Sequence, residues 1–353
     1  MTLSTPEVRL ERMRAFLERR NDEPLLGFFV GSYYPLRRYR AAAALPAGIL
    51  TPADVDIATY LPDYDRLHSL HSACPGDLLW TATAFWGIPW LEAALGCAVE
   101  ADHTTGSCRS HTPSTEGWPS VPRYSPGNPW VARCLEMLHA LARHAAGRYP
   151  LGTTLMRGVA DLLSALLGAD RLIYAMLDDP ARIHALAEGI CEFWIAFGHA
   201  QLDVIPRFCA GYGSFFYNLW APGPCIWLQE DAAALLSPAL YEEFILPYDR
   251  RIASAFDYAF IHFHPARYIP YRPLLTSDLA VIELHIDKGG PSARQLLPIY
   301  RDIQAHRPLY VWGDISEDDL HTLLHELDPA GLAIEVVVDT PAGARDLHER
   351  LIG

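Results

Sequence analysis

Two short segments near the end of the chain combine histidines and acids at a spacing of two residues. FIHFHPARY carries His262 and His264, and LAVIELHIDKGG carries Glu283, His285 and Asp287. Side chains two residues apart on a strand point to the same side, so each set can face one pocket. Imidazole and carboxylate groups suit zinc and other transition metals. We therefore expect His262, His264 and His285 to hold Zn²⁺, with Glu283 and Asp287 as catalytic groups. The alternative for a histidine at a strand end is a hydrogen-bonded packing role.

Both segments end apolar runs that belong to a strict alternation of strands and helices in the last hundred residues. Runs with little alternation in polarity are typical of strands buried on both faces of a parallel sheet. Functional groups collect at the carboxyl ends of such strands, and neighbouring strands lie about 4.8 Å apart, so the two sets should meet. The four runs are YAFIHFH, LAVIELHI, PLYVWGD and LAIEVVVD.

This alternation predicts one α/β domain over residues 1–353, a (β/α)8 TIM barrel with an N-terminal helical extension. An open doubly wound sheet is the alternative, but the sequence has no glycine-rich dinucleotide fingerprint. Helices are expected over 130–146 and 180–202, and Pro247 is expected to kink or divide another helix. Residues 78–97 predict a strand followed by a helix. Residues 103–130, rich in Gly, Pro, Ser and Thr, predict a long loop.

Composition narrows the class of protein. The chain is 50% hydrophobic, which favours a large core, and its net charge of −14 comes without a basic stripe, which argues against nucleic acid as a partner. No apolar run approaches the roughly 20 residues that span a bilayer, so no membrane segment is expected. The seven cysteines are scattered without a CxxC pair. This pattern favours reduced thiols in a cytoplasmic protein.

Residues 211–231 are rich in aromatic side chains, and a basic segment precedes residue 41. We expect Tyr212, Tyr217 and Trp220 to wall a pocket for a small-molecule substrate, although packing at the rim of the sheet explains them equally well. Arg37 and Arg38 are candidates for binding a substrate carboxylate or phosphate, with an ordinary surface role as the alternative. Exposed aromatic residues would also permit a homodimer.

The segment LQEDAAALLSPALYEEFILPYDRRI resembles the pattern D…LLSP…Y.EF..PY of the uroporphyrinogen decarboxylase superfamily. GIPWLEAALGC, the FIHFH run, YVWGDIS and DTPAGARDL follow in the order of that superfamily. The resemblance implies a single closed barrel with an active-site cleft at the carboxyl ends of the strands. It also implies a catalytic role for Asp231, which matches the acidic position before LLSP.

The superfamily contains two main chemistries. Metal-free decarboxylases hold a tetrapyrrole with an arginine-rich N-terminal motif, and the matching region LLGFFVGSYYPLRRYR keeps arginines without the MRQAGRY pattern. Zinc methyltransferases move a methyl group from a methylated corrinoid to a thiol and use an H-x-C motif plus a later cysteine. His262 and His264 stand at the H-x-C position, and EVVVDTP replaces the later cysteine. The third ligand would then be Glu283, His285 or Asp339.

The resemblance makes a zinc-dependent methyltransferase with a divergent ligand set the first hypothesis. Its donor would be a methylated corrinoid, supplied by a corrinoid protein, or a small methyl donor. A metal-free decarboxylase acting on a tetrapyrrole or another carboxylate is the second hypothesis. A non-catalytic binding barrel that serves as a partner of a corrinoid protein is the third.

Overall fold

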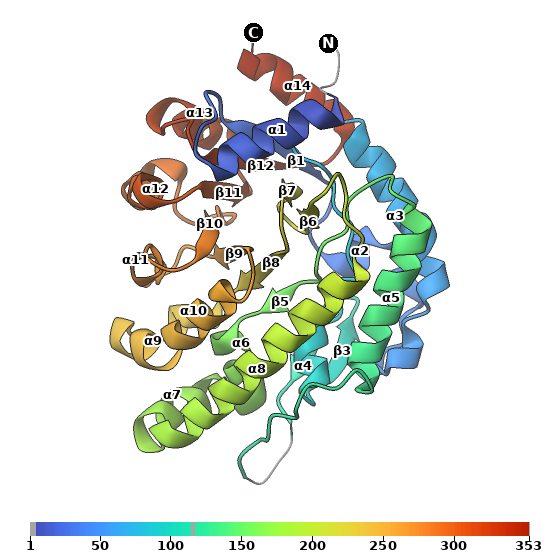
Figure 1. The fold of residues 1–353 in the computed structure, drawn as a ribbon, viewed down its shortest axis with the longest axis vertical. Coiled ribbons are helices and arrows are strands. Elements are labelled where there is room, and N and C mark those ends of the chain that lie inside the picture. Colours follow the sequence, from blue (N-terminus) through green and yellow to red (C-terminus); the bar gives the residue numbers. More distant parts are fainter. Residues whose placement is uncertain (1–4, 114–116, 353) are drawn as a thin grey trace.

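The computed structural model of the protein describes residues 5–113 and 117–352. Its centre is a seven-stranded parallel sheet in the order β1-β12-β11-β10-β9-β8-β5, which confirms an α/β fold. The sheet curves around the middle of the molecule, and helices cover its outer side (Figure 1). Its strands are β1 (Leu25–Val30), β5 (Met156–Arg157), β8 (Cys225–Gln229), β9 (Tyr258–Phe263), β10 (Leu279–Leu284), β11 (Leu309–Gly313) and β12 (Leu332–Val338).

The four strands predicted from the last hundred residues are β9 to β12. Every residue of β11 is buried, and five of the six residues of β10 are buried. Both faces of these strands are therefore covered, which explains why their sequences lack a polar–apolar alternation. β1 pairs with β12 over its whole length, from Leu25 opposite Ala333 to Val30 opposite Val338. The strands that come first and last along the chain are thus neighbours in the sheet.

Residues 77–82 contact β1 and the segment that precedes β5 without forming a regular strand of the central sheet. The amide of Asp77 donates to the carbonyl of Leu26 at 2.7 Å, and Ala82 forms an isolated parallel bridge with Leu151. The strand predicted within residues 78–97 is therefore reduced to a single bridge. The helix predicted after Pro89 is present as α4 (Trp90–Ala94).

The helices begin where the sequence signals indicate. Asn128 caps α5 by accepting from the amides of Trp130 and Val131, and Pro180 occupies the first turn of α8. Pro247 lies in the first turn of α10, so it divides two helices instead of kinking one. The helices are α1 (Pro6–Leu17), α2 (Pro35–Arg38), α3 (Ile57–Ser72), α4 (Trp90–Ala94), α5 (Pro129–Ala145), α6 (Val159–Leu167), α7 (Ala169–Asp178), α8 (Pro180–Val204), α9 (Pro238–Phe244), α10 (Leu246–Ser254), α11 (Tyr271–Leu274), α12 (Ala293–His306), α13 (Glu317–Glu326) and α14 (Pro341–Ile352). Within the described ranges, no helix is both long and apolar enough to cross a membrane.

The loop predicted over residues 103–130 is partly wrong. β4 (Ser107–His111) pairs antiparallel with β3 (Ala98–Asp102), and β2 (Gly48–Ile49) completes a small three-stranded sheet. Alternating serine, cysteine and arginine in β4 gave a weak hydrophobic signal, because only Cys108 of this strand is buried. Part of the predicted loop, 114–116, lies outside the described residues.

A hairpin of β6 (Tyr212–Ser214) and β7 (Leu219–Ala221) lies on the inner side of the curved sheet (Figure 1). Its tip contacts side chains of three strands. The Tyr217 hydroxyl donates to Glu283 at 3.1 Å, the Tyr310 hydroxyl donates to the carbonyl of Tyr217 at 2.7 Å, and the Asn218 amide donates to Glu335. The hairpin therefore satisfies the buried polar groups that the strands turn inward.

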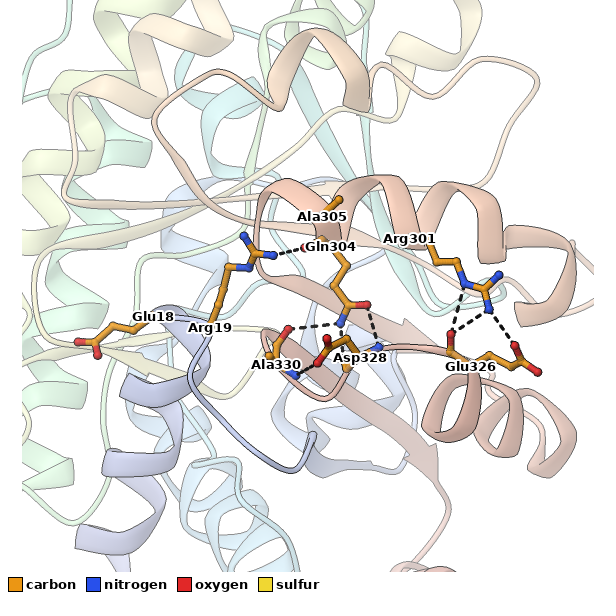
Figure 2. A pocket seen from close by; sticks show the side chains of 8 residues that line it. All are labelled: Glu18, Arg19, Arg301, Gln304, Ala305, Glu326, Asp328 and Ala330. Atoms are coloured by element: carbon orange, nitrogen blue, oxygen red, sulfur yellow. Dashed lines mark hydrogen bonds and ion pairs between the residues drawn. The ribbon is translucent and has the colours of Figure 1, made fainter.

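A polar cavity of about 510 Å³ lies at the amino ends of β11 and β12 (Figure 2). We call its central group, formed by Arg19, Gln304, Asp328 and Ala330, the amino-end clasp. Arg19 donates to the carbonyl of Gln304 at 2.5 Å, and the buried Gln304 side chain accepts from the Asp328 amide at 3.2 Å. The Gln304 amide group also donates to the carbonyls of Asp328 and Ala330. The clasp ties the end of α1 to the loop before β12.

Candidate metal centre at the carboxyl ends of the strands

Three neighbouring strands bring the predicted groups together. The register places Gln229 of β8 beside His262 of β9, and His262 beside Glu283 of β10. Asp231, His264 and His285 each lie two residues further along, so they form a second row above the first. The sequence showed that these residues are spaced two apart along each strand. The register shows in addition that the residues of neighbouring strands lie side by side.

Carboxylates hold one ring nitrogen of each of the three histidines. Glu283 contacts Nδ1 of His262 through one oxygen and Nδ1 of His285 through the other, at 3.3 Å for His285. Asp287 contacts Nδ1 of His264 at 2.7 Å. A carboxylate next to Nδ1 fixes the ring and leaves Nε2 as the nitrogen available to a metal. This is the usual arrangement of histidines that bind metals.

Three of the available atoms converge on one point. The Asp231 Oδ1 atom lies 3.9 Å from Nε2 of His262 and 3.9 Å from Nε2 of His264, and the ligand atoms of this group all lie within 4.8 Å of one another. Asp231 Oδ1 is buried without a hydrogen-bond partner among the described residues. Buried oxygens are rarely left unpaired, so a cation between these three groups would satisfy it. The residues fit a metal bound by two histidines and one carboxylate.

Two further groups of acids and histidines have ligand spacing, namely His262 with Glu283 and His285, and His264 with His285 and Asp287. In both groups the ligand atoms already contact one another, because Glu283 and Asp287 hold the Nδ1 atoms. Glu283 is also completely buried. The group containing Asp231 is therefore the best candidate, and His285, predicted as a ligand, remains available for another role.

Asp231 is itself held in place from the first turn of α6. Its amide donates to Asp161 at 3.1 Å, and the Ala232 amide donates to the other Asp161 oxygen at 2.8 Å. Burial, together with the charge of Asp231, raises the pKa of Asp161 to about 8. Arg157 lies nearby and forms an ion pair with the buried Glu92 at 2.9 Å. The charge of Asp231 therefore favours the neutral form of Asp161, while Arg157 opposes this effect.

Burial and neighbouring charges give the three imidazoles different protonation preferences. Burial lowers the pKa of His262 to about 3 and also lowers the pKa of His285. Burial opposes protonation of His264 as well, but its hydrogen bond with Asp287 and the surrounding carboxylates raise its pKa to about 9. In the absence of metal, His264 is therefore the cationic imidazole, and a metal must displace its proton.

The site opens into a cavity of about 390 Å³. Phe216 stacks on Trp227 with ring centroids 5.2 Å apart, and Trp312 packs edge-on against His285 at 4.7 Å. The volume and the aromatic walls suit a small ligand, since such pockets usually measure about 300–1,000 Å³. The lining residues are Tyr33, Tyr34, Phe216, Trp227, Gln229, His262, His264, His285, Asp287, Lys288, Trp312 and Asp314.

The predicted substrate-binding residues lie outside this lining. Arg38 is buried and donates to the carbonyl of Val30, while Arg37 donates to the carbonyl of Thr104. Each of the five predicted residues of this kind has an intramolecular contact. The remaining three are Tyr217, whose hydroxyl holds Glu283, Trp220, whose ring nitrogen donates to the carbonyl of Phe208, and Tyr212 in the hairpin stem.

Sequence reasoning missed several residues of the cavity, and Asp339, considered as a ligand, is exposed and outside all three groups. Tyr33, Trp312 and Lys288 line the cavity. Lys288 carried a readable signal, because it is the only lysine in the sequence and directly follows Asp287. Trp312 had no such signal, since it looks like any other apolar residue of a buried strand.

Compared with known proteins, the chain matches no family model and, at a significant level, no curated protein.

Proposed function

We propose that the protein is a metal-dependent enzyme whose metal is held by His262, His264 and Asp231. The observation that carries this proposal is the convergence of two Nε2 atoms on the unpaired, buried Asp231 Oδ1. Two histidines and a carboxylate leave coordination positions open, as in catalytic zinc sites and non-haem iron sites. Zn²⁺ is the metal we propose.

We further propose a closed (β/α)8 barrel of the uroporphyrinogen decarboxylase type. The pairing of β1 with β12 supports closure on one side. Residues 77–82 contact Leu26 of β1 and Leu151 just before β5, which supports an irregular eighth strand between the two edges of the sheet. The position of the site at the carboxyl ends of the strands agrees with where barrel enzymes place their chemistry.

The reaction we propose is methyl transfer to a thiol. A zinc ion bound at the site would lower the pKa of a thiol, so that a thiolate forms near neutral pH. His285 is suited to take the thiol proton, because burial keeps its ring neutral and Glu283 would stabilise the imidazolium through Nδ1. The new S–C bond forms as the bond from the methyl carbon to the donor breaks, and that electron pair leaves with the donor.

The size of the cavity bears on the methyl donor. A space of about 390 Å³ suits a small methyl donor inside the site. A methylated corrinoid would have to approach the mouth while bound to its own protein. The aromatic walls would exclude water from the thiolate and so preserve its reactivity.

Zinc titration of the purified protein tests the metal site. We expect one tightly bound ion per chain, lost in His264→Ala, because His264 is a half-buried ligand whose removal spares the core. His321→Ala is the matched control, since His321 lies exposed on α13 beside His325. A wild-type chain without stoichiometric zinc, or a loss of zinc in the control alone, would contradict the proposal.

Cobalt substitution tests the thiol step. Adding 2-mercaptoethanol to the cobalt-loaded protein should produce a sulfur-to-cobalt charge-transfer band as the thiolate binds the metal. The band can be assigned to the added thiol, because no cysteine is among the described residues lining the cavity. His285→Gln should keep the band but require a higher pH to form it. Absence of the band would leave a metal site without thiol activation and would contradict methyl transfer.

A metal-free decarboxylase is the second candidate, and one observation favours it. The carboxylates around His264 raise its pKa to about 9, which gives the cavity a fixed cation for a substrate carboxylate when no metal is bound. Full activity on a carboxylate substrate in metal-free protein, with none in His264→Ala, would favour this second function over the first.

A further inference from the structure

Lys288 is the one lysine among the 28 lysine and arginine residues of the chain, and it lines the cavity of the candidate site. Arginine therefore supplies every other permanent side-chain cation. Lysine differs from arginine in presenting a compact ammonium with three donors on a flexible stem. Its single occurrence at the cavity makes Lys288 the residue most in need of a functional explanation.

The backbone around Lys288 is fixed relative to the site. Ile286 forms a bridge with Gly313 of β11, and Asp287 contacts Nδ1 of His264. The Gly290 amide donates to the carbonyl of Asp287 at 2.9 Å, and Gly289 adopts a φ of +77°, which closes a tight turn. The turn sets the lysine at the rim of the cavity while its ammonium stays free to adjust.

The charges around the rim leave the lysine without a partner. Asp287 is paired with His264 at 2.7 Å, and Asp314 accepts from the Tyr33 hydroxyl at 3.5 Å. Lys288 is exposed at the rim, and within residues 5–113 and 117–352 its ammonium forms no hydrogen bond or ion pair, so it is open to solvent and to a ligand. A ligand anion that enters the cavity would meet this ammonium at its outer end and the metal ligands at its inner end.

We propose that Lys288 binds the carboxylate of a small, flat, apolar substrate whose body lies against Phe216, Trp227 and Trp312. The inference rests on the proposed function, because it names the substrate class of the same site. The stacked rings of Phe216 and Trp227 form a flat apolar wall, and Trp312 adds a second surface. A carboxylate at the rim would orient such a substrate with its opposite end toward His262 and His264.

The single lysine makes a direct test practical. Reductive methylation with ¹³C-formaldehyde labels the Lys288 amine and the chain's α-amino group while keeping their charge. Lys288→Met identifies which dimethylamine resonance belongs to the lysine. Benzoate and benzamide are then titrated into metal-free protein that carries His264→Ala, because this variant lacks the cationic imidazole that would also attract a carboxylate. The two probes share a ring and differ in charge. Benzoate should shift the Lys288 resonance and bind more tightly than benzamide.

Variants decide whether the ammonium is responsible. By ligand-observed NMR, Lys288→Met should weaken benzoate about fivefold, the scale of an exposed ion pair, and leave benzamide unchanged. Lys288→Arg should retain benzoate, and Arg294→Met is the control because it removes one exposed cation from the neighbouring helix α12. Equal binding of both probes, no binding of either, or full benzoate affinity in Lys288→Met would overturn the proposal.

Failure of this inference and failure of the proposed function give different results. Zinc binding by the wild type, lost in His264→Ala, together with unchanged benzoate affinity in Lys288→Met, would leave the metal site intact and remove only the role of the lysine. Selective benzoate binding through Lys288 in a protein that never binds zinc would keep the anion site and remove the metal.

Discussion

The two ends of the sheet carry polar cavities that differ in how their polar groups are satisfied. In the amino-end clasp, both polar atoms of the buried Gln304 side chain pair with neighbouring main-chain groups, and Arg19 donates to the carbonyl of Gln304 (Figure 2). At the carboxyl end, the buried Asp231 Oδ1 has no such partner among the described residues, and the cavity is rimmed by the exposed Lys288. Polar groups that satisfy one another stabilise a fold, whereas polar groups left unpaired around a cavity indicate a ligand.

Histidines show the same contrast on a smaller scale. His71, on α3, uses both ring nitrogens, since Nδ1 contacts the carbonyl of Leu67 at 2.7 Å and Nε2 accepts from the Val30 amide at 3.1 Å. In His262 and His264 only Nδ1 has a close partner, and Nε2 faces Asp231. The difference separates a histidine that supports the packing of β1 from two that can bind a metal.

The largest effect is expected when Asp231 is changed to Asn. Loss of the anionic ligand should weaken zinc binding by about 100-fold or more, measured by competition with a chelator. The metal-free variant should be as stable as the wild type or more stable, because the charge of Asp231 no longer raises the pKa of the buried Asp161. A variant that binds zinc normally, or that unfolds more easily without metal, would place Asp231 among the structural groups.

The second-largest effect is expected for His71, whose protonation in acid should destabilise the folded protein. Burial and the nearby Arg38 lower the pKa of His71 to about 3, well below the value of about 6.5 in the unfolded chain. A lowered pKa contributes stability above pH 6.5 that is lost as the pH falls toward 3. When the pH falls from 7 to 4, protonation linked to this histidine should lower the free energy of unfolding by about 3 kcal/mol.

Urea unfolding at a series of pH values measures this contribution. His71→Gln should be less stable than the wild type at pH 7, because the imidazole no longer bridges α3 and β1, but it should lose less stability on acidification. His321→Gln, changed at an exposed histidine, should follow the wild-type slope. Parallel pH slopes for the wild type and His71→Gln would mean that His71 protonates without unfolding the protein.

The sheet and the grouping of ligands could be predicted to different extents from the sequence. β9 to β12 were readable because each is a short apolar run followed by a helix with its own period. The spacing of His262 and His264 also revealed that they share a side. The pairing of Gln229 with His262 and of His262 with Glu283 was not readable, because register depends on packing between distant segments.

The hairpin shows where the sequence left two alternatives open. Tyr212, Tyr217 and Trp220 resemble the aromatic wall of a pocket, yet the structure uses them on the inner side of the sheet. Composition cannot separate these two uses, since both demand large apolar surfaces. What distinguishes them is the partner of each polar atom, such as Glu283 for the hydroxyl of Tyr217, and only the three-dimensional structure supplies it.

The smallest effect is expected at the amino-end clasp. Gln304→Ala removes a buried side chain that pairs with the amide of Asp328 and with two carbonyls, and we expect the free energy of unfolding to fall by about 2 kcal/mol. Zinc affinity should stay unchanged. Arg301→Ala is the matched control, because its exposed ion pair with Glu326 on the same cavity should contribute less than about 1 kcal/mol. A Gln304→Ala variant of full stability but weakened zinc binding would mean that the two ends of the sheet are coupled, and that full hydrogen bonding does not mark a purely structural region.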